Sequence, residues 1–169
     1  MADLLSHVLI AHVVKRLSPW PRGVLAFAIG TTLPDVAGRV PRVVLNILDR
    51  TGEASLPPLL GAVWGVLHVP VPFVVLCTFL ALLFPIQEQR VSLFRNLCLG
   101  GLLHLAVDFL QVHIDGGSYP IFFPVSIKGY ELGWVSTEAS LDWIPWLVPA
   151  ALMAEGWYRR RAREQDQLP

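Results

Sequence analysis

Hydrophobic and polar residues alternate along the chain in long blocks, so that extended apolar segments are separated by short polar ones. Between Glu53 and Glu88 there is no Asp, Glu, Lys or Arg, and His68 is the one side chain in that stretch that titrates near neutral pH. A segment of this length without a polar face is not suited to the surface of a water-soluble protein. The pattern therefore predicts a polytopic membrane protein.

Prolines, glycines and charged clusters divide the chain into five expected helices. They cover residues 3–17, 20–37, 56–85, 93–112 and 141–160. The first has about 15 residues where a span needs about 20, so it lies in the interface, enters partway or crosses with a strong tilt. The third should kink or break just after His68, because Pro70 and Pro72 follow. The expected fold class is all-α: a transmembrane helical bundle with four spans, or five if the first helix crosses.

The segments between these helices are expected to be loops. The second helix should end near Pro34 and Asp35, and residues 38–56 read as a loop with a short amphipathic helix. Residues 113–140 are rich in glycine, proline and aromatic residues, which suits an ordered loop over one membrane face. Residues 1–169 form a single membrane-embedded domain, with residues 161–169 as a frayed cytoplasmic tail.

Composition supports this class. The chain is 54% hydrophobic and 15% charged, and its mean hydropathy is +0.55. Its formal net charge is zero, so nucleic acid is not an expected partner. Cys77 and Cys98 are expected to be buried thiols, since no C-x-x-C pattern is present. The acidic start "MADLL" lacks a basic region, which argues against a cleaved signal peptide.

The basic residues predict an orientation. If four helices span, one side of the membrane receives Lys15, Arg16, Arg22, Arg90, Arg95, Arg159, Arg160, Arg161 and Arg163. The other side receives only Arg39, Arg42, Arg50 and Lys128. The positive-inside rule then places the C-terminus of an integral cell-membrane protein in the cytoplasm.

Ionisable residues inside the apolar segments are the candidate site residues, because placing such a residue in a membrane is costly. For an aspartate at the centre of a membrane helix the cost is about 2.5–3.5 kcal/mol. His104 and Asp108 are four residues apart and share one helical face. They can ligate one metal ion, or two ions with the aspartate bridging. Alternatively, they can satisfy each other through an intrahelical hydrogen bond. Gln111 and Asp115 continue the same polar stripe toward the helix end.

Five other residues are weighed with that pair. Asp35 is either a site residue or a plain turn residue, and His68 lies where the prolines free backbone carbonyls, as in a helix that lines a cavity. His7 is favoured over His12, because His12 precedes Lys15 and Arg16 and should lie near the surface. His113 adjoins a loop and is expected at the rim.

Nitrogen and oxygen ligands without thiolates suit zinc, with manganese, iron or magnesium as weaker candidates. Three histidines and two aspartates could hold one catalytic ion with an open position, or two ions that share a carboxylate. Either arrangement activates water for hydrolysis. The chain has no nucleophile motif, P-loop or glycine-rich dinucleotide motif, so metal-activated water is the simplest enzyme mechanism.

Short motifs along the chain resemble one known family. "SHVLIAH", "LPDV", "LHVP", "HLAVD" and "GGSYPIFFPVS" follow the order found in membrane-bound metal-dependent hydrolases. That family is also labelled LexA-binding, inner-membrane-associated hydrolase, and is distantly similar to zinc-dependent phospholipase C. The chain looks most like the archaeal members, and the resemblance covers nearly all of it.

The resemblance implies a role for particular residues. It marks His7, Asp35, His68, His104 and Asp108 as metal ligands, with His104 and Asp108 at the catalytic centre. It places Tyr119 and Ser126 against substrate or behind the ligands, a position that Gln111 also suits. Bacterial members often carry a richer His-Arg-x-x-Thr-His segment where this chain has "LHVPVP", which leaves a two-metal centre one histidine short.

Two functions remain open at this point. The first is a membrane-embedded metal-dependent hydrolase that acts on a lipid-derived ester or phosphodiester taken from the bilayer, with the loop 113–140 capping an outward-facing site. The second is a non-enzymatic helical membrane protein, either a scaffold or a conduit for protons or metal ions, that uses the same His and Asp residues. The sequence does not fix the oligomeric state, the substrate or the number of ions.

Overall fold

The computed structural model describes residues 4–18, 23–50, 68–112, 119–136 and 139–166. The regular elements in these residues are helices, without a β-strand, and residues 119–136 form a loop. The helices are α1 (Leu4–Leu17), α2 (Val24–Arg50), α4 (Pro70–Leu82), α5 (Gln87–Leu110), the short α6 (Ala139–Asp142) and α7 (Ile144–Asp166). The all-α class predicted from the sequence is therefore found in the described part of the chain.

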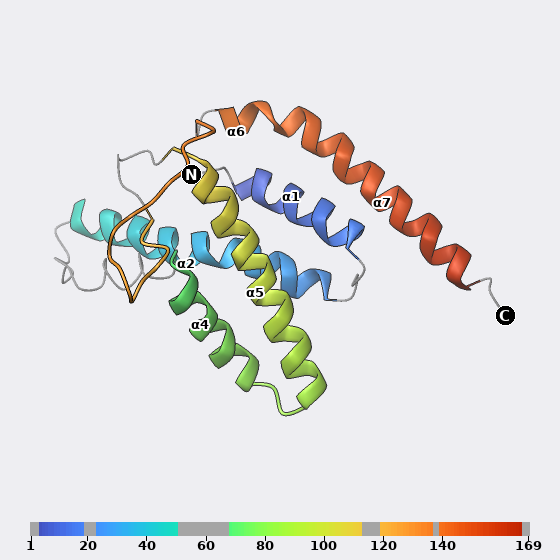
Figure 1. Cartoon of the computed structure of the whole chain (residues 1–169), viewed down its shortest axis with the longest axis horizontal. Coiled ribbons are helices and arrows are strands. Elements are labelled where there is room, and N and C mark those ends of the chain that lie inside the picture. The colour runs from blue at the N-terminus through green and yellow to red at the C-terminus, as the bar shows by residue number, and fades with distance from the viewer. Residues whose placement is uncertain (1–3, 19–22, 51–67, 113–118, 137–138, 167–169) are drawn as a thin grey trace.

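Helix α5 lies at the centre of the bundle. Helices α2, α4 and α1 all pack against it, and α7 packs on the outer side of α1 (Figure 1). The end of α1 and the start of α2 lie on the right of this view, the turn from α4 to α5 lies at the bottom, and the C-terminal end of α7 lies at the right. The start of α1, the end of α5 and the following loop lie at the opposite end.

The close approach of α2 and α5 depends on glycine. A Cβ atom on Gly30 would overlap the backbone carbonyl of Leu97, and one on Gly100 would overlap the backbone carbonyl of Phe27. Small residues at such points let two helix backbones come together, as is common between membrane helices. Gly101 makes similar room for the fully buried ring of Phe73 from α4. These contacts fix α2 and α4 on two sides of α5.

A buried polar contact joins the C-terminal part of α1 to the first half of α5. Lys15 is 4% exposed, and its Nζ donates to Oδ1 of Asn96, 2.6 Å away. The same Nζ lies 5.3 Å from the centre of the Phe27 ring, close enough for a cation–π interaction. The sequence places Lys15 at an exposed helix end. It is buried because it lies on the same face of α1 as His7 and Ala11, which packs against the rest of the bundle.

Several predicted boundaries were wrong. Helix α2 does not end near Asp35 but continues to Arg50 through the predicted loop, because Val36, Val40, Val44 and Ile47 keep a helical spacing. Helix α5 begins at Gln87 rather than residue 93, and α7 reaches Asp166, so the tail is not frayed from residue 161 onward. Both extensions consist largely of Gln, Glu, Arg and Ala, which favour helix even where they are polar.

The break after His68 was predicted correctly. Val69 is extended, with φ −120° and ψ 134°, and α4 starts at Pro70. The first half of the predicted third helix, residues 56–67, lies outside the described residues, as do residues 113–118 of the predicted loop. Cys77 and Cys98 are buried, as expected, in one core cluster with Phe73 and Leu97.

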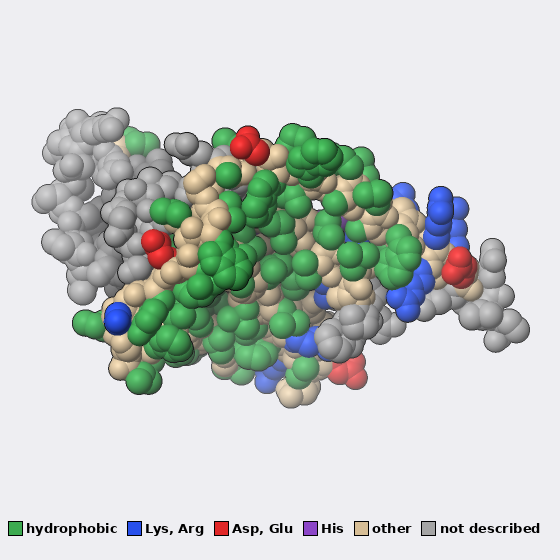
Figure 2. Space-filling model, turned by 45° about the horizontal axis from the view of Figure 1, so that its top comes forward, with side chains coloured by type: hydrophobic (Ala, Val, Ile, Leu, Met, Phe, Trp, Pro, Cys, Tyr) green, Lys and Arg blue, Asp and Glu red, His purple; other side chains and the backbone are tan. Residues whose placement is uncertain are grey.

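One described helix, α5, is long and apolar enough to cross a membrane. The part of α2 from Val24 to Ala37 and the whole of α4 are apolar but shorter. On the face drawn in Figure 2, hydrophobic side chains cover the middle of the molecule, and most Lys and Arg side chains gather on its right-hand side. The four-span or five-span topology remains a prediction.

Candidate metal centre

Two residues of the site come from the last two turns of α5. His104 and Asp108 are 0% and 1% exposed, and Nε2 of His104 lies 3.3 Å from Oδ2 of Asp108. The i, i+4 spacing points both side chains to the same side of the helix, toward α1 and α2. The polar face of this otherwise apolar helix therefore meets polar side chains of α1 and α2.

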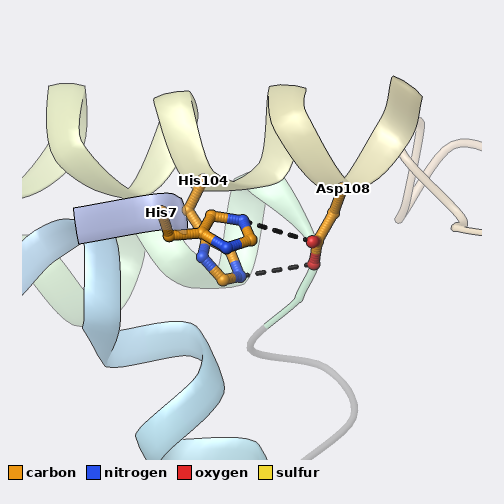
Figure 3. A group of neighbouring side chains, drawn as sticks. All are labelled: His7, His104 and Asp108. Carbon is orange, nitrogen blue, oxygen red and sulfur yellow. Dashed lines mark ion pairs between the residues drawn. The ribbon is translucent and has the colours of Figure 1, made fainter. Parts of the chain in front are cut away.

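Helix α1 brings His7 to this pair. Nε2 of His7 lies 3.3 Å from Oδ1 of Asp108, and the rings of His7 and His104 are 4.2 Å apart between centroids. Figure 3 shows the two imidazoles next to each other, each directing a nitrogen at a different oxygen of the Asp108 carboxylate. All three side chains are at most 1% exposed.

The remaining two residues approach His104 from the other side. Oδ1 of Asp35, on α2, lies 4.0 Å from Nε2 of His104 and 3.6 Å from Nε2 of His68. The His68 ring lies 5.8 Å from the His104 ring, and His68 is positioned by the break that precedes α4. Asp35 is 2% exposed, so it is not a solvent-facing turn residue. His104 therefore belongs to two neighbouring groups, His7–His104–Asp108 and Asp35–His68–His104.

Three of these separations match those between ligands of one metal ion: 3.3 Å for His7–Asp108 and His104–Asp108, and 3.6 Å for His68–Asp35. A hydrogen bond between nitrogen and oxygen is about 2.9 Å long. Ligand atoms held tetrahedrally at about 2.0–2.2 Å from a zinc ion are about 3.3–3.6 Å apart. His68 Nε2, both ring nitrogens of His104 and Oδ1 of Asp108 are buried without a hydrogen bond among the described residues. A divalent cation would satisfy these atoms.

Two further predicted residues border the cluster. The hydroxyl of Tyr119 donates to Oδ2 of Asp108 across 3.5 Å, which ties the loop after α5 to the site. Gln111 is 3% exposed, directly follows α5, and has a buried Oε1 without a hydrogen bond among the described residues. Both positions suit residues that orient a ligand from behind.

The contacts described for Ser126 and His12 are with residues other than the five. The hydrogen bonds described for Ser126 stay inside its own loop, with Lys128 N donating to its hydroxyl and its own N donating to Phe122 O. His12 is 31% exposed and lies 3.4 Å from Glu155 of α7, so its exclusion from the site agrees with the structure. His113 and Asp115 lie outside the described residues.

Sequence reasoning overlooked the glycines that align this site. Gly100 of α5 lies against Thr31 of α2. Asp35 follows Thr31 by four residues, about one helical turn, and His104 follows Gly100 by the same number. Because the helices run in the same direction here, the close contact places the carboxylate opposite the imidazole. Gly100 and Gly101 form the only adjacent glycine pair inside the described helices, which is the signal that could have been used.

Comparison of the chain with protein-family models, with curated proteins and with solved structures finds no match.

Proposed function

We propose that this chain is an integral membrane, metal-dependent hydrolase that acts on a lipid-derived ester or phosphodiester. The observation that carries the proposal is the convergence of three histidines and two aspartates, from three helices and one helix start, inside an apolar bundle. Burying two carboxylates among hydrophobic helices is costly unless a cation compensates them. The resemblance to membrane-bound metal-dependent hydrolases supports the same reading.

A divalent ion held here, with zinc as the first candidate, would make a coordinated water nucleophilic near neutral pH. Catalytic zinc commonly takes three protein ligands, so two of the five side chains would not be needed as ligands. A carboxylate or imidazole that is not a ligand can accept a proton from the nucleophile and return it to the leaving group. Tyr119, which already donates to Asp108, can hold that carboxylate in place.

The depth of the cluster suits a substrate that enters from lipid. Most basic residues lie near the end of α1, the start of α5 and the end of α7, which together form the basic end of the bundle. Measured along the helix axis from this end, His7 lies about 15 Å from Leu17 in α1, and His104 lies about 25 Å from Gln87 in α5. A hydrocarbon core is about 30 Å thick. If the basic end faces the cytoplasm, the centre lies in the outer half of the bilayer, as the four-span prediction also has it.

Metal removal tests the proposal. Protein purified with its metal should contain about one ion per chain or more and should hydrolyse chromogenic phosphodiester or ester probes dispersed in detergent. Dialysis against a chelator should remove both the metal and the activity, and zinc should restore both. Stoichiometric metal without hydrolysis of any probe would favour the conduit, and protein without bound metal would favour the scaffold.

Topology is tested separately by cysteine labelling in intact cells. A membrane-impermeant maleimide is expected to label Ser118→Cys, and to label Glu164→Cys, near the end of α7, only after permeabilisation. The native cysteines are buried, so the wild type supplies the background. Labelling of Glu164→Cys alone would reverse the orientation, and equal labelling of both sites would contradict a membrane span between them.

A further inference from the structure

The loop that follows α5 exposes large hydrophobic side chains. Val125 is 94% exposed, Ile127 86% and Trp134 74%. These are apolar residues that a folded loop in water would turn inward or replace with polar ones, because exposing them forgoes burial. A surface of this kind marks a contact with another apolar phase or molecule.

The loop is held firmly in spite of its exposed surface. Leu132 N donates to Phe109 O, Trp134 N to Leu110 O and Val112 N to Val135 O, each across 2.9 Å, which ties the end of the loop to the end of α5. The backbones of Tyr119 and Tyr130 donate to each other's carbonyls across 3.2 and 2.9 Å and close the loop at its base. The exposed residues are therefore presented outward from a fixed base.

The neighbouring helix surface identifies what meets the loop. Helix α7 has no charged residue from Ile144 to Ala154, and Trp146, Leu152 and Met153 in that stretch are 79%, 69% and 68% exposed. The loop lies at the end of the bundle where α7 begins (Figure 1). Exposed apolar side chains are thus found both on the loop and on the first half of α7, the surface that the proposed bilayer would cover.

The chemistry of the loop matches the headgroup boundary rather than the bilayer centre. Trp134 and Trp146 are amphipathic rings of the kind that gather at this boundary. Lys128 is exposed between Ile127 and the Tyr130 ring, with its Nζ 5.6 Å from the ring centre, where it can reach a lipid phosphate while apolar neighbours enter the acyl layer. A protein partner would not require this layering of cation, aromatic ring and aliphatic tip.

We propose that the loop Tyr119–Val135 inserts its apolar tip into the interfacial layer of the bilayer and forms the sideways entrance by which a lipid reaches the metal centre. The inference rests on the membrane setting of the proposed function and names its substrate class as a bilayer lipid with an anionic headgroup. Tyr119 connects the two parts, because the residue at the base of the loop also donates to Asp108. The entrance and the centre are then adjacent along one short stretch of chain.

Depth measurement tests the insertion. The full chain carrying Val125→Cys or Ile127→Cys is labelled with an environment-sensitive fluorophore and reconstituted into vesicles of neutral and anionic phospholipid. Both probes are expected to emit at shorter wavelength and to be quenched more by a nitroxide on shallow lipid acyl positions than by a water-soluble quencher. Glu164→Cys is the matched control and should show the opposite order of quenching.

Other results would overturn the proposal. Quenching of the Val125 and Ile127 probes mainly by the aqueous reagent would place the loop in water. Protection from both quenchers that disappears when the protein is diluted into excess lipid would assign the tip to a second copy of the chain. The same probes in an Asp108→Asn background separate the two proposals: unchanged depth with lost metal upholds the loop assignment independently of catalysis. Release of the protein from vesicles would instead contradict the membrane setting itself.

Discussion

Replacing His104 with alanine is expected to remove stoichiometric metal from the purified protein and to abolish metal-dependent hydrolysis. His104 is the one residue that belongs to both groups of ligands, so its loss leaves neither group complete. Loss of residues that merely orient a ligand lowers metal affinity by roughly 10–100-fold, so loss of this central ligand should exceed about 100-fold. Elemental analysis of the purified variant, with isothermal titration of zinc into the metal-free form, measures the effect.

The matched control for this prediction is His12→Ala. His12 lies on the same helix as His7 but faces Glu155 instead of the cluster, so the variant should keep its metal. Asp108→Asn serves as a second variant in case His104→Ala does not fold, because it keeps the size of the side chain and removes its charge. Stoichiometric metal in both cluster variants, with helix content unchanged by circular dichroism, would place the metal elsewhere.

Gly100→Ala is expected to destabilise the bundle and weaken metal binding together. The added methyl group meets the carbonyl of Phe27 and lies 2.9 Å from the backbone nitrogen of Thr31, and neither backbone atom can move independently of α2. Overpacking of this kind costs about 1–3 kcal/mol. Pushing α2 away also withdraws Asp35 from His104, so zinc affinity should fall although no ligand has changed. Thermal unfolding in detergent and zinc titration measure the two effects.

Gly156→Ala is the same substitution in a helix with no atom within 4 Å of the new methyl group. It should leave zinc affinity unchanged and stabilise the protein by up to about 1 kcal/mol, the difference in helix propensity between the two residues. Equal behaviour of the two alanine variants would show that the close contact of α2 and α5 does not position the site.

Three of the five proposed ligands stand out in the sequence because each breaks a local rule. His104 and Asp108 are polar residues on one face of an otherwise apolar helix, and His68 precedes two prolines that end any helix before it. These are exceptions within a few residues, which periodicity and proline chemistry reveal. The choice of His7 over His12 agrees with the structure, although one of the charges on which it was based, Lys15, is buried.

What sequence could not give is the geometry that depends on helices far apart in the chain. Lys15 was expected at the surface because nothing near it in sequence shows that Asn96, 81 positions later, accepts from its amine. The sequence left open whether Asp35 is a site residue or a turn residue, because it is buried only by the packing of α2 against α5. The extension of α2 to Arg50 was missed because its charges were weighed above the spacing of its aliphatic residues.

The balance of charge at the cluster has a consequence for how many ions it holds. The donors are two carboxylates and three imidazoles, and imidazoles that ligate a metal are neutral. In the ionisation state that metal binding requires, the two carboxylates give the donor set two negative charges, and one divalent ion brings the total to zero. A second ion would leave two positive charges in a medium of low dielectric constant, where uncompensated charge is most costly. Occupancy by a second ion is therefore tied to the arrival of an anionic ligand, so the count of ions should rise when a phosphate-bearing molecule occupies the site.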